Sequence, residues 1–285
     1  MSALARPRTA APVLPRARPL GRLAIAALHA ELACSPKPGL VTPFSRGSHH
    51  DMDAGTFLRS LFALRGYFTA IAAQAATCAD FAPLRQLGIQ AERGMLAATG
   101  NVNTHRGAIF SLGLLVASAA RLRADACPAR SADAVCDGVR QWRHALLQAP
   151  LDATSPGQRA RARHAVPGVR EQAAVGFPLL REVAVPALRA ALADGLPRDA
   201  ALLQTLMQLV AVTDDLNLLH RGGAEGLAFA QAQARGFLAA GGVRAADAPA
   251  HMARICNAFE QRRLSPGGSA DLLACALFLL QQEAA

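Results

Sequence analysis

Acidic residues and histidines are concentrated in one short segment near the N-terminus. The stretch GSHHDMD, residues 47–53, places His49 and His50 beside Asp51 and Asp53. Two carboxylates two positions apart can share a hard cation such as Mg²⁺, and an imidazole can carry a proton near neutral pH. One aspartate could instead cap the helix predicted to begin near residue 54, which would explain a single acid but not the histidines.

A second acidic pair, Asp214 and Asp215, occurs in TDDLNLLHRGG, residues 213–223. Adjacent acids in an apolar stretch are costly unless they are paired or bound to a metal. Asp214, Asn217 and Arg221 share one helical face by steps of three and four residues, and His220 lies close to that face. The Gly-Gly pair that follows is typical of a helix end.

Two further segments have the form of helix starts that can bind phosphate. GNVNTHRGAIFSLGLL, residues 100–115, offers Asn103 or Thr104 as a cap, followed by His105 and Arg106. LSPGGSADLLACALFLL, residues 264–280, leads from glycines and a serine into an apolar helix. The free N–H groups and positive dipole end of a helix bind anions. Each segment could equally be an ordinary capped turn. The single lysine, Lys37, stands between two prolines in backbone that cannot be helical.

Helical periodicity recurs through the chain, and no run of β-branched residues alternates as a strand would. The chain is therefore predicted to be all-α: residues 1–22 form a flexible basic N-terminal tail, expected to be dispensable, and residues 23–285 form a single multi-helix catalytic domain with central buried helices. Residues 150–178 are expected to be irregular. The predicted helices lie near residues 22–33, 54–79, 85–99, 106–124, 132–148, 178–194, 198–220, 224–240, 249–263 and 269–283.

Composition limits the possible partners and the compartment. Half of the formal net charge of +10 comes from five arginines in residues 1–22, so the body is only mildly basic and suits an anionic ligand. Nucleic acid is an unlikely partner because no Arg/Lys stripe is interleaved with aromatics. The cysteines show no C-x-x-C spacing, which indicates a reducing, cytoplasmic location. The apolar run from Gly107 to Ala120 is too short to cross a membrane.

Five of these segments together resemble the triphosphoribosyl-dephospho-CoA synthase family: SPKPGLV, GSHHDMD, NTHRGAIFSLGLL, DLNLLHRGG and SPGGSADLLA. They occur in the same order as in the family and span residues 31–275. The resemblance implies a transferase that joins the ribose C1 of ATP to the 2′-hydroxyl of 3′-dephospho-CoA and releases adenine. The triphosphate would stay on the product, which is destined for an acyl carrier protein of malonate decarboxylase or citrate lyase. It also implies Mg²⁺ as cofactor, an oxocarbenium-like state at C1 and two polyanionic substrates.

The resemblance assigns roles to the polar segments. His49 is expected to carry the proton, and His105 is the competing candidate for that role. Asp53 and Asp214 are expected to lie beside C1 of the ATP ribose or to bind the metal. The metal ligands are expected to be Asp51, Asp53, Asp214 and Asp215. The substrate-binding residues are expected to be Lys37, Ser48, Asn103, His105, Arg106, Arg170, Asn217, His220, Arg221, Gly222, Gly223, Ser265, Gly267, Gly268 and Ser269.

Three positions depart from the family pattern. Thr42 stands where citrate-lyase-branch members tend to carry Asp, which favours the malonate decarboxylase branch, and Asn101 replaces a glycine. Near residue 170 the pattern calls for an acid, and either Glu171 or Gln172 fills that place. Two rival functions remain: a metal phosphohydrolase using His50 and Asp51, and a basic helical nucleic-acid-binding protein. A homodimer is possible.

Overall fold

The computed structural model describes residues 13–125, 130–148, 156–164 and 166–285, and within these ranges the fold is all-α, as predicted. The described chain contains no β-strand, only an isolated bridge between Thr42 and Ser45. The α-helices are α1 (Val13–Ala33), α2 (Ala54–Thr77), α3 (Phe81–Thr99), α4 (Arg106–Ala124), α5 (Ala132–Gly138), α6 (Arg143–Gln148), α7 (Pro156–His164), α8 (Val169–Ala174), α9 (Val185–Ala193), α10 (Arg198–Val212), α11 (Leu216–Ala239), α12 (Ala248–Gln261) and α13 (Gly267–Glu283).

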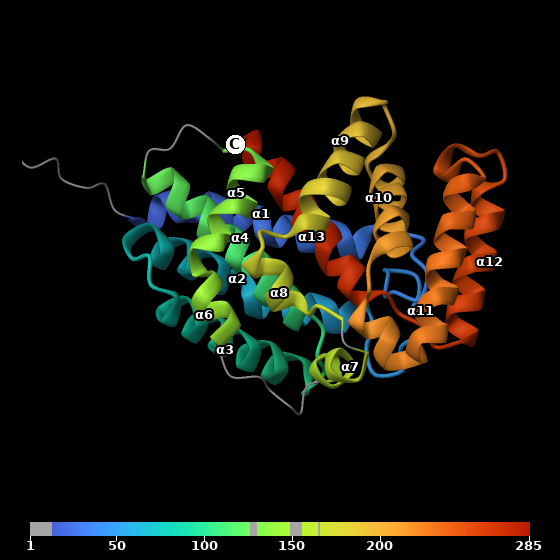
Figure 1. Cartoon of the computed structure of the whole chain (residues 1–285), viewed down its shortest axis with the longest axis horizontal. Coiled ribbons are helices and arrows are strands. Elements are labelled where there is room, and N and C mark those ends of the chain that lie inside the picture. Colours follow the sequence, from blue (N-terminus) through green and yellow to red (C-terminus); the bar gives the residue numbers. More distant parts are fainter. Residues whose placement is uncertain (1–12, 126–129, 149–155, 165) are drawn as a thin grey trace, which may run out of the picture.

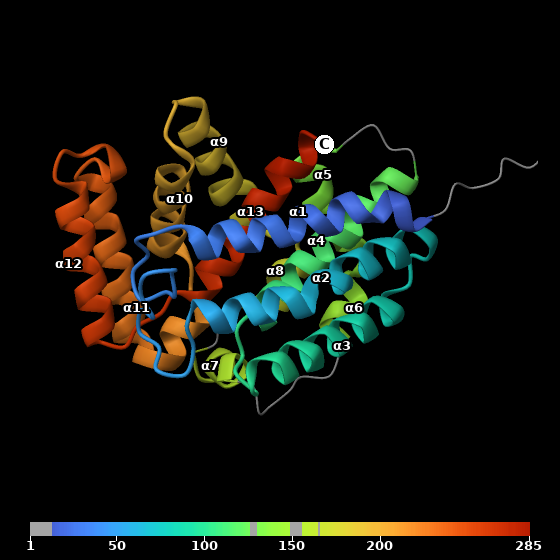
Figure 2. The ribbon, with the colours of Figure 1, turned by 180° about the vertical axis from the view of Figure 1, so that it is seen from behind.

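Two apolar helices form the centre of the molecule, as their composition predicts. Helices α4 and α13 pack against each other and against α1 (Figure 1). Helix α2 packs against both α3 and α4. Helix α4 is long and apolar enough to cross a membrane, but 67% of its apolar window is buried inside the protein, as in the core helix of a compact domain. Helices α9 to α12 lie at one end of the molecule, and α3 and α6 lie at the other (Figure 2). The N-terminal ends of α4 and α13 are thereby held inside the fold.

The first helix corrects the predicted boundary of the N-terminal tail. Helix α1 begins at Val13, not near residue 22, and the side chains of Ala17 and Leu20 are 4% and 1% exposed. The prolines at the start of the segment suggested an extended tail, but the apolar residues between the arginines fall on the face that packs against α2. Residues 13–22 therefore belong to the folded domain, and residues 1–12 lie outside the described ranges.

We expect the substitution Leu20→Ala to lower the free energy of unfolding by about 2 kcal/mol, the lower end for a buried leucine, because a site near a helix end can relax. Chemical denaturation followed by circular dichroism measures the change. Leu58→Ala is the matched control, since Leu58 is 39% exposed and should change stability by less than about 0.5 kcal/mol. Equal stability of Leu20→Ala and the unaltered protein would restore the original boundary.

Other boundaries also differ from the prediction. The segment expected to be irregular, residues 150–178, contains α7 and α8. The expected helix at 198–220 breaks at Thr213, where the backbone turns extended, and α11 starts after Asp215. The Gly-Gly pair, which was predicted to end a helix, lies inside α11 and produces a kink there, where Gly223 has φ 64°. The break at residue 213 places both aspartates of the second acidic pair in a loop before a helix, and not on a helical face.

Candidate active site

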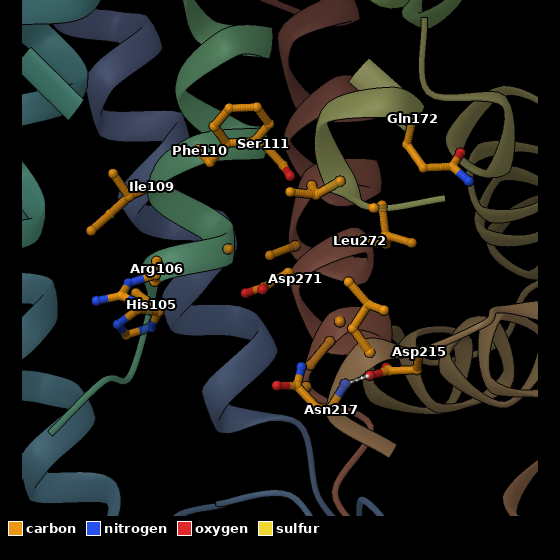
Figure 3. A pocket seen from close by; sticks show the side chains of 18 of the residues that line it. His105, Arg106, Ile109, Phe110, Ser111, Gln172, Asp215, Asn217, Asp271 and Leu272 are labelled. Atoms are coloured by element: carbon orange, nitrogen blue, oxygen red, sulfur yellow. Dashed lines mark hydrogen bonds between the residues drawn. The ribbon is translucent and has the colours of Figure 1, made fainter. Parts of the chain in front are cut away.

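A cavity of about 900 Å³ lies between the central helices and the two loops that carry the polar motifs. Figure 3 shows side chains from α4, α8, α11 and α13 around it. Its lining includes apolar residues, among them Ile71, Leu84 and Phe110, together with most of the polar residues singled out above. A cavity of this size can hold a nucleotide-sized ligand.

Three helices direct their N-terminal ends at this cavity. Its lining includes Arg106 and Gly107 in the first turn of α4, Asn217 at the start of α11, and Gly267 and Gly268 at the start of α13. The first backbone N–H groups of a helix have no partner within the helix, and the helix dipole favours negative charge there. Three such ends around one space make it a strong site for a polyanion.

Buried polar atoms without a partner gather in the same lining. Within the described ranges, the unpartnered atoms include Thr104 Oγ1, His105 Nε2, Gln172 Oε1 and Thr213 Oγ1, and all four residues line the cavity. Leaving such an atom buried and unpaired costs about 1–3 kcal/mol. Their concentration in one place indicates that a ligand with polar groups completes these hydrogen bonds.

His105 is the most deeply buried of these groups, with an exposed fraction of 3%. Its Nδ1 lies 2.7 Å from Ser60 Oγ on α2, and the edge of the Phe57 ring packs against it. Burial, helped by the nearby positive charge of Lys37, lowers the pKa of His105 to about 3. The ring is therefore neutral at physiological pH, and its Nε2 remains available to a ligand.

His49 is held differently, because both of its ring nitrogens already have protein partners. Nε2 lies 2.9 Å from Ser265 Oγ, and Nη2 of Arg221 donates to Nδ1 at 3.0 Å. A guanidinium can only donate, so Nδ1 accepts and the ring proton is on Nε2. Burial and the charge of Arg221 lower the pKa of His49 to about 4. His49 lines the cavity, but its contacts suit a positioning role better than that of a proton carrier.

The two acidic pairs are each split between two environments. Asp51 is exposed and lines the cavity, whereas Asp53 lies outside the lining, caps α2 through Thr56 N at 2.9 Å and pairs with Arg46. Asp53 is thus the capping residue that the sequence left open. The hydrogen bonds from Thr56 lower the pKa of the Asp53 carboxyl.

In the second pair, Asp214 is exposed to the cavity and Asp215 is 1% exposed. The Asp215 carboxylate accepts four hydrogen bonds, from the backbone N–H groups of Asn217 and Leu218 and from the N–H and Oγ of Ser269. Burial raises the pKa of Asp215, whereas these four donors favour its anionic form. With its acceptor sites filled, Asp215 ties the start of α11 to the start of α13 and has no oxygen left for a metal.

Several residues predicted to bind substrate serve as the scaffold of the loop before α2. Lys37 is 3% exposed and donates to Glu31, and Ser48 Oγ donates to the carbonyl oxygen of Leu264 at 2.6 Å. Arg221 donates to the carbonyl oxygens of Ser48 and Arg263, both at 3.1 Å. These contacts fasten the loop against the turn before α13.

The predicted site residues divide clearly by position. The following line the cavity: His49, Asp51, Asn103, His105, Arg106, Arg170, Asp214, Asp215, Asn217, His220, Arg221, Ser265, Gly267 and Gly268. The following lie outside its lining: Lys37, Ser48, Asp53, Gly222, Gly223 and Ser269. Within the described ranges, no group of three or more His, Cys, Asp or Glu side chains is arranged to hold a metal ion.

The loop near residue 170 presents an amide, not an acid, to the cavity. Glu171 is occupied by the N–H of Gly168 at 2.9 Å and by Arg161, and only Gln172 reaches the lining. Of the two candidates for the acidic position, Gln172 is therefore the one that faces the cavity.

Four acidic residues of the lining were assigned no role from the sequence: Glu31, Glu92, Glu182 and Asp271. Of these, Asp271 belongs to α13. It lies in the SPGGSADLL motif, where attention to the glycines and serines as a phosphate-binding turn left the acid unassigned. The sequence does contain a signal for Asp271, because a carboxylate near the start of an apolar helix is costly to bury unless it has a partner or a function.

The fold and the cavity agree with what comparison with known proteins finds. Residues 17–285 match the family described as CitG: ATP:dephospho-CoA triphosphoribosyl transferase. A protein of Citrobacter koseri, named a probable 2-(5''-triphosphoribosyl)-3'-dephosphocoenzyme-A synthase, is 39% identical over 91% of this chain and 89% of its own length. One of the same name from Acinetobacter calcoaceticus is 38% identical over 93% of this chain and 91% of its own.

The corresponding synthase of Pectobacterium atrosepticum is 39% identical over 87% of this chain and 84% of its own length. No solved structure matches the fold. Since the family match covers nearly all of the domain and the relatives align over most of both chains, this chain is a transferase that belongs to the CitG family of ATP:dephospho-CoA triphosphoribosyl transferases.

Proposed function

We propose that the chain transfers the triphosphoribosyl group of ATP to the 2′-hydroxyl of 3′-dephospho-CoA and releases adenine. The relatives carry the name of this activity. The observation that carries the proposal for this chain is the cavity on which the N-terminal ends of α4, α11 and α13 meet. Both substrates are polyanions, and the positive dipole ends of helix starts are suited to their phosphates. The apolar residues of the lining suit the uncharged parts of the two substrates.

Mg²⁺ fits this site as a companion of the triphosphate. Asp51 and Asp214 are the exposed carboxylates of the two acidic segments in the lining, and Mg²⁺ is commonly bound by one or two carboxylates together with substrate phosphates. The lack of a larger ligand group within the described ranges agrees with this mode of binding. When bound, the ion would neutralise phosphate charge, and Asp51 and Asp214 would hold it.

We further propose that the product serves the malonate decarboxylase carrier protein and that the enzyme acts in the cytoplasm. The support for the branch is Thr42 at a position where the citrate lyase branch tends to have Asp. Thr42 is buried and its Oγ1 accepts from the N–H of Ser45 at 3.1 Å, so it shapes the turn before the GSHHDMD segment. Assaying attachment of the product to each of the two carrier proteins distinguishes the branches.

Replacing Arg106 by glutamine should raise the Kd for ATP by about 10- to 100-fold, because a charge-assisted hydrogen bond to phosphate contributes roughly 1.5–3 kcal/mol. Arg106 lines the cavity in the first turn of α4 and pairs there with Glu92. Isothermal titration with ATP and Mg²⁺ measures the change. Glu92→Gln is the matched control, since it breaks the same ion pair but keeps the cation. Weakening of ATP binding by both variants would show that the pair acts structurally.

The proposed reaction is tested by incubating the protein with ATP, Mg²⁺ and dephospho-CoA and analysing the small molecules by mass spectrometry. We expect free adenine in an amount equal to a product that contains dephospho-CoA and the triphosphoribosyl group. Release of phosphate without adenine would instead support the phosphohydrolase alternative.

A further inference from the structure

Asp271 occupies an unusual position at the wall of the cavity. It projects from the second turn of α13 toward the first turn of α4, where Gly107 lies (Figure 3). A Cβ atom on Gly107 would lie 2.0 Å from Oδ2 of Asp271. The carboxyl group therefore fills the space that any side chain at position 107 would take, and glycine at that position is what allows the approach.

The carboxyl group is fixed there on one side and open on the other. Gly107 leaves room for it against the start of α4, where the backbone N–H of Ala108 favours its charged form. Asp271 as a whole is only partly buried, because it borders the cavity. The same wall carries Nε2 of His105, which is 3% exposed and has no partner. A carboxyl group packed against the start of α4 and an unpartnered imidazole in the same lining mark a place where a ligand with ring nitrogens or hydroxyls is expected to bind.

The charges around Asp271 favour its protonated form. Burial raises the pKa of Asp271 well above its ordinary value, and the negative charges of Glu31 and Asp215 raise it further. The Ala108 N–H opposes this shift without reversing it. His105 is neutral and supplies no positive charge, and the pairing of Glu31 with Lys37 weakens the effect of Glu31, so burial is the main cause of the shift.

The thiol of Cys275, one turn further along α13, and the guanidinium of Arg106 complete the surroundings. Burial raises the pKa of the Cys275 thiol well above its usual range, so the thiol is uncharged. Arg106 is engaged by Glu92. A carboxylic acid kept protonated in this way is the kind of group that glycosyl-transferring enzymes use to protonate a leaving group.

We propose that Asp271 is the catalytic acid that protonates the departing adenine, an inference that rests on the proposed transfer reaction. As the bond between ribose C1 and adenine N9 breaks, its electron pair leaves with the base and the Asp271 proton passes to an adenine ring nitrogen. The 2′-oxygen of dephospho-CoA forms the new bond to C1 and releases its proton to water, and Asp271 takes a proton back from water. The net change is one proton moved from the hydroxyl group to adenine.

The test compares ATP with 2-fluoro-ATP, whose base leaves more readily because the fluorine withdraws electrons. With ATP, Asp271→Asn should lower the single-turnover rate of adenine release by about 10²–10⁴-fold, the usual contribution of one acid–base group, with the Kd for ATP nearly unchanged. With 2-fluoro-ATP the deficit of the variant should shrink by roughly tenfold or more, since a better leaving group needs less protonation. Asp194→Asn, at an exposed ion pair with Arg244, is the control and should behave as the unaltered protein.

A second measurement uses only the unaltered protein, in case the variant does not fold. Because the protonated acid is the active form, the rate with ATP should fall as pH rises through the pKa of Asp271 in the folded protein, and the fall should be weaker with 2-fluoro-ATP. An equal deficit with both nucleotides, an unchanged rate in Asp271→Asn, or identical pH profiles would assign Asp271 a structural role and overturn the inference. Failure of the unaltered protein to release adenine would instead overturn the proposed function and the inference together.

Discussion

Substituting methionine for Lys37 should lower the free energy of unfolding by about 3–5 kcal/mol, the usual cost of removing one partner of a buried ion pair. The Lys37 and Glu31 side chains are 1% and 8% exposed, and the ammonium group donates to both the carboxylate and the backbone carbonyl oxygen of Glu31. Without the lysine, Glu31 would keep its charge in a buried site or take up a proton at a cost in free energy. Urea denaturation at neutral pH measures the loss.

The double variant Lys37→Met with Glu31→Leu is the matched control. Because the uncompensated charge is then absent, most of the lost stability should return. If Lys37 acts instead as a phosphate-binding residue, the single variant should keep its stability and lose affinity for ATP, and that result would contradict the structural role.

Replacing Asp215 by alanine should be nearly as severe, at about 2–4 kcal/mol. The loss combines about 1 kcal/mol for the helix cap of α11 with about 1–3 kcal/mol for the Ser269 donors left buried and unpaired. Since Asp215 joins the starts of α11 and α13, the variant should also bind ATP more weakly through disorder of both helix ends. Thermal unfolding by calorimetry and ATP titration record the two effects.

Asp214→Ala provides a closely matched control one residue away. Asp214 is exposed in the cavity, so its loss should change stability by less than about 0.5 kcal/mol and should act on catalysis or on Mg²⁺-dependent ATP binding. Equal stability of the two variants would contradict the division of roles between these neighbours.

The central helices could be predicted from the sequence because their cause is local. Helix α4 was predicted at its observed bounds, since an apolar run with a polar cap and no prolines has few alternatives. The start of α1 was not predicted, because it contains Pro15 in its first turn and Pro19 inside the helix, and prolines are also common in extended tails. Only the packing of α1 against α2 and α13 decides between a helix and an extended tail for these residues.

The site was predictable as a set of segments but not residue by residue. Asp51 and Asp53 are alike in the sequence, as are Asp214 and Asp215, yet in each pair one carboxylate is exposed in the cavity and the other bonds to backbone N–H groups at a helix start. That choice depends on where the chain turns, which a motif does not specify. Asp271 was missed because its significance comes from Gly107, on a different helix and distant in sequence.

The cavity as the place of reaction is tested most directly by an experimental structure of the protein with ATP and Mg²⁺ but without dephospho-CoA, so that no transfer occurs. We expect the triphosphate oxygens to lie within hydrogen-bonding distance of the N–H groups at the starts of α4 and α13, and Asp51 or Asp214 to contact the ion. The adenine should lie at the wall formed by His105 and Asp271. A nucleotide bound outside this cavity, with the N-terminal ends of α4, α11 and α13 free of phosphate, would contradict the account.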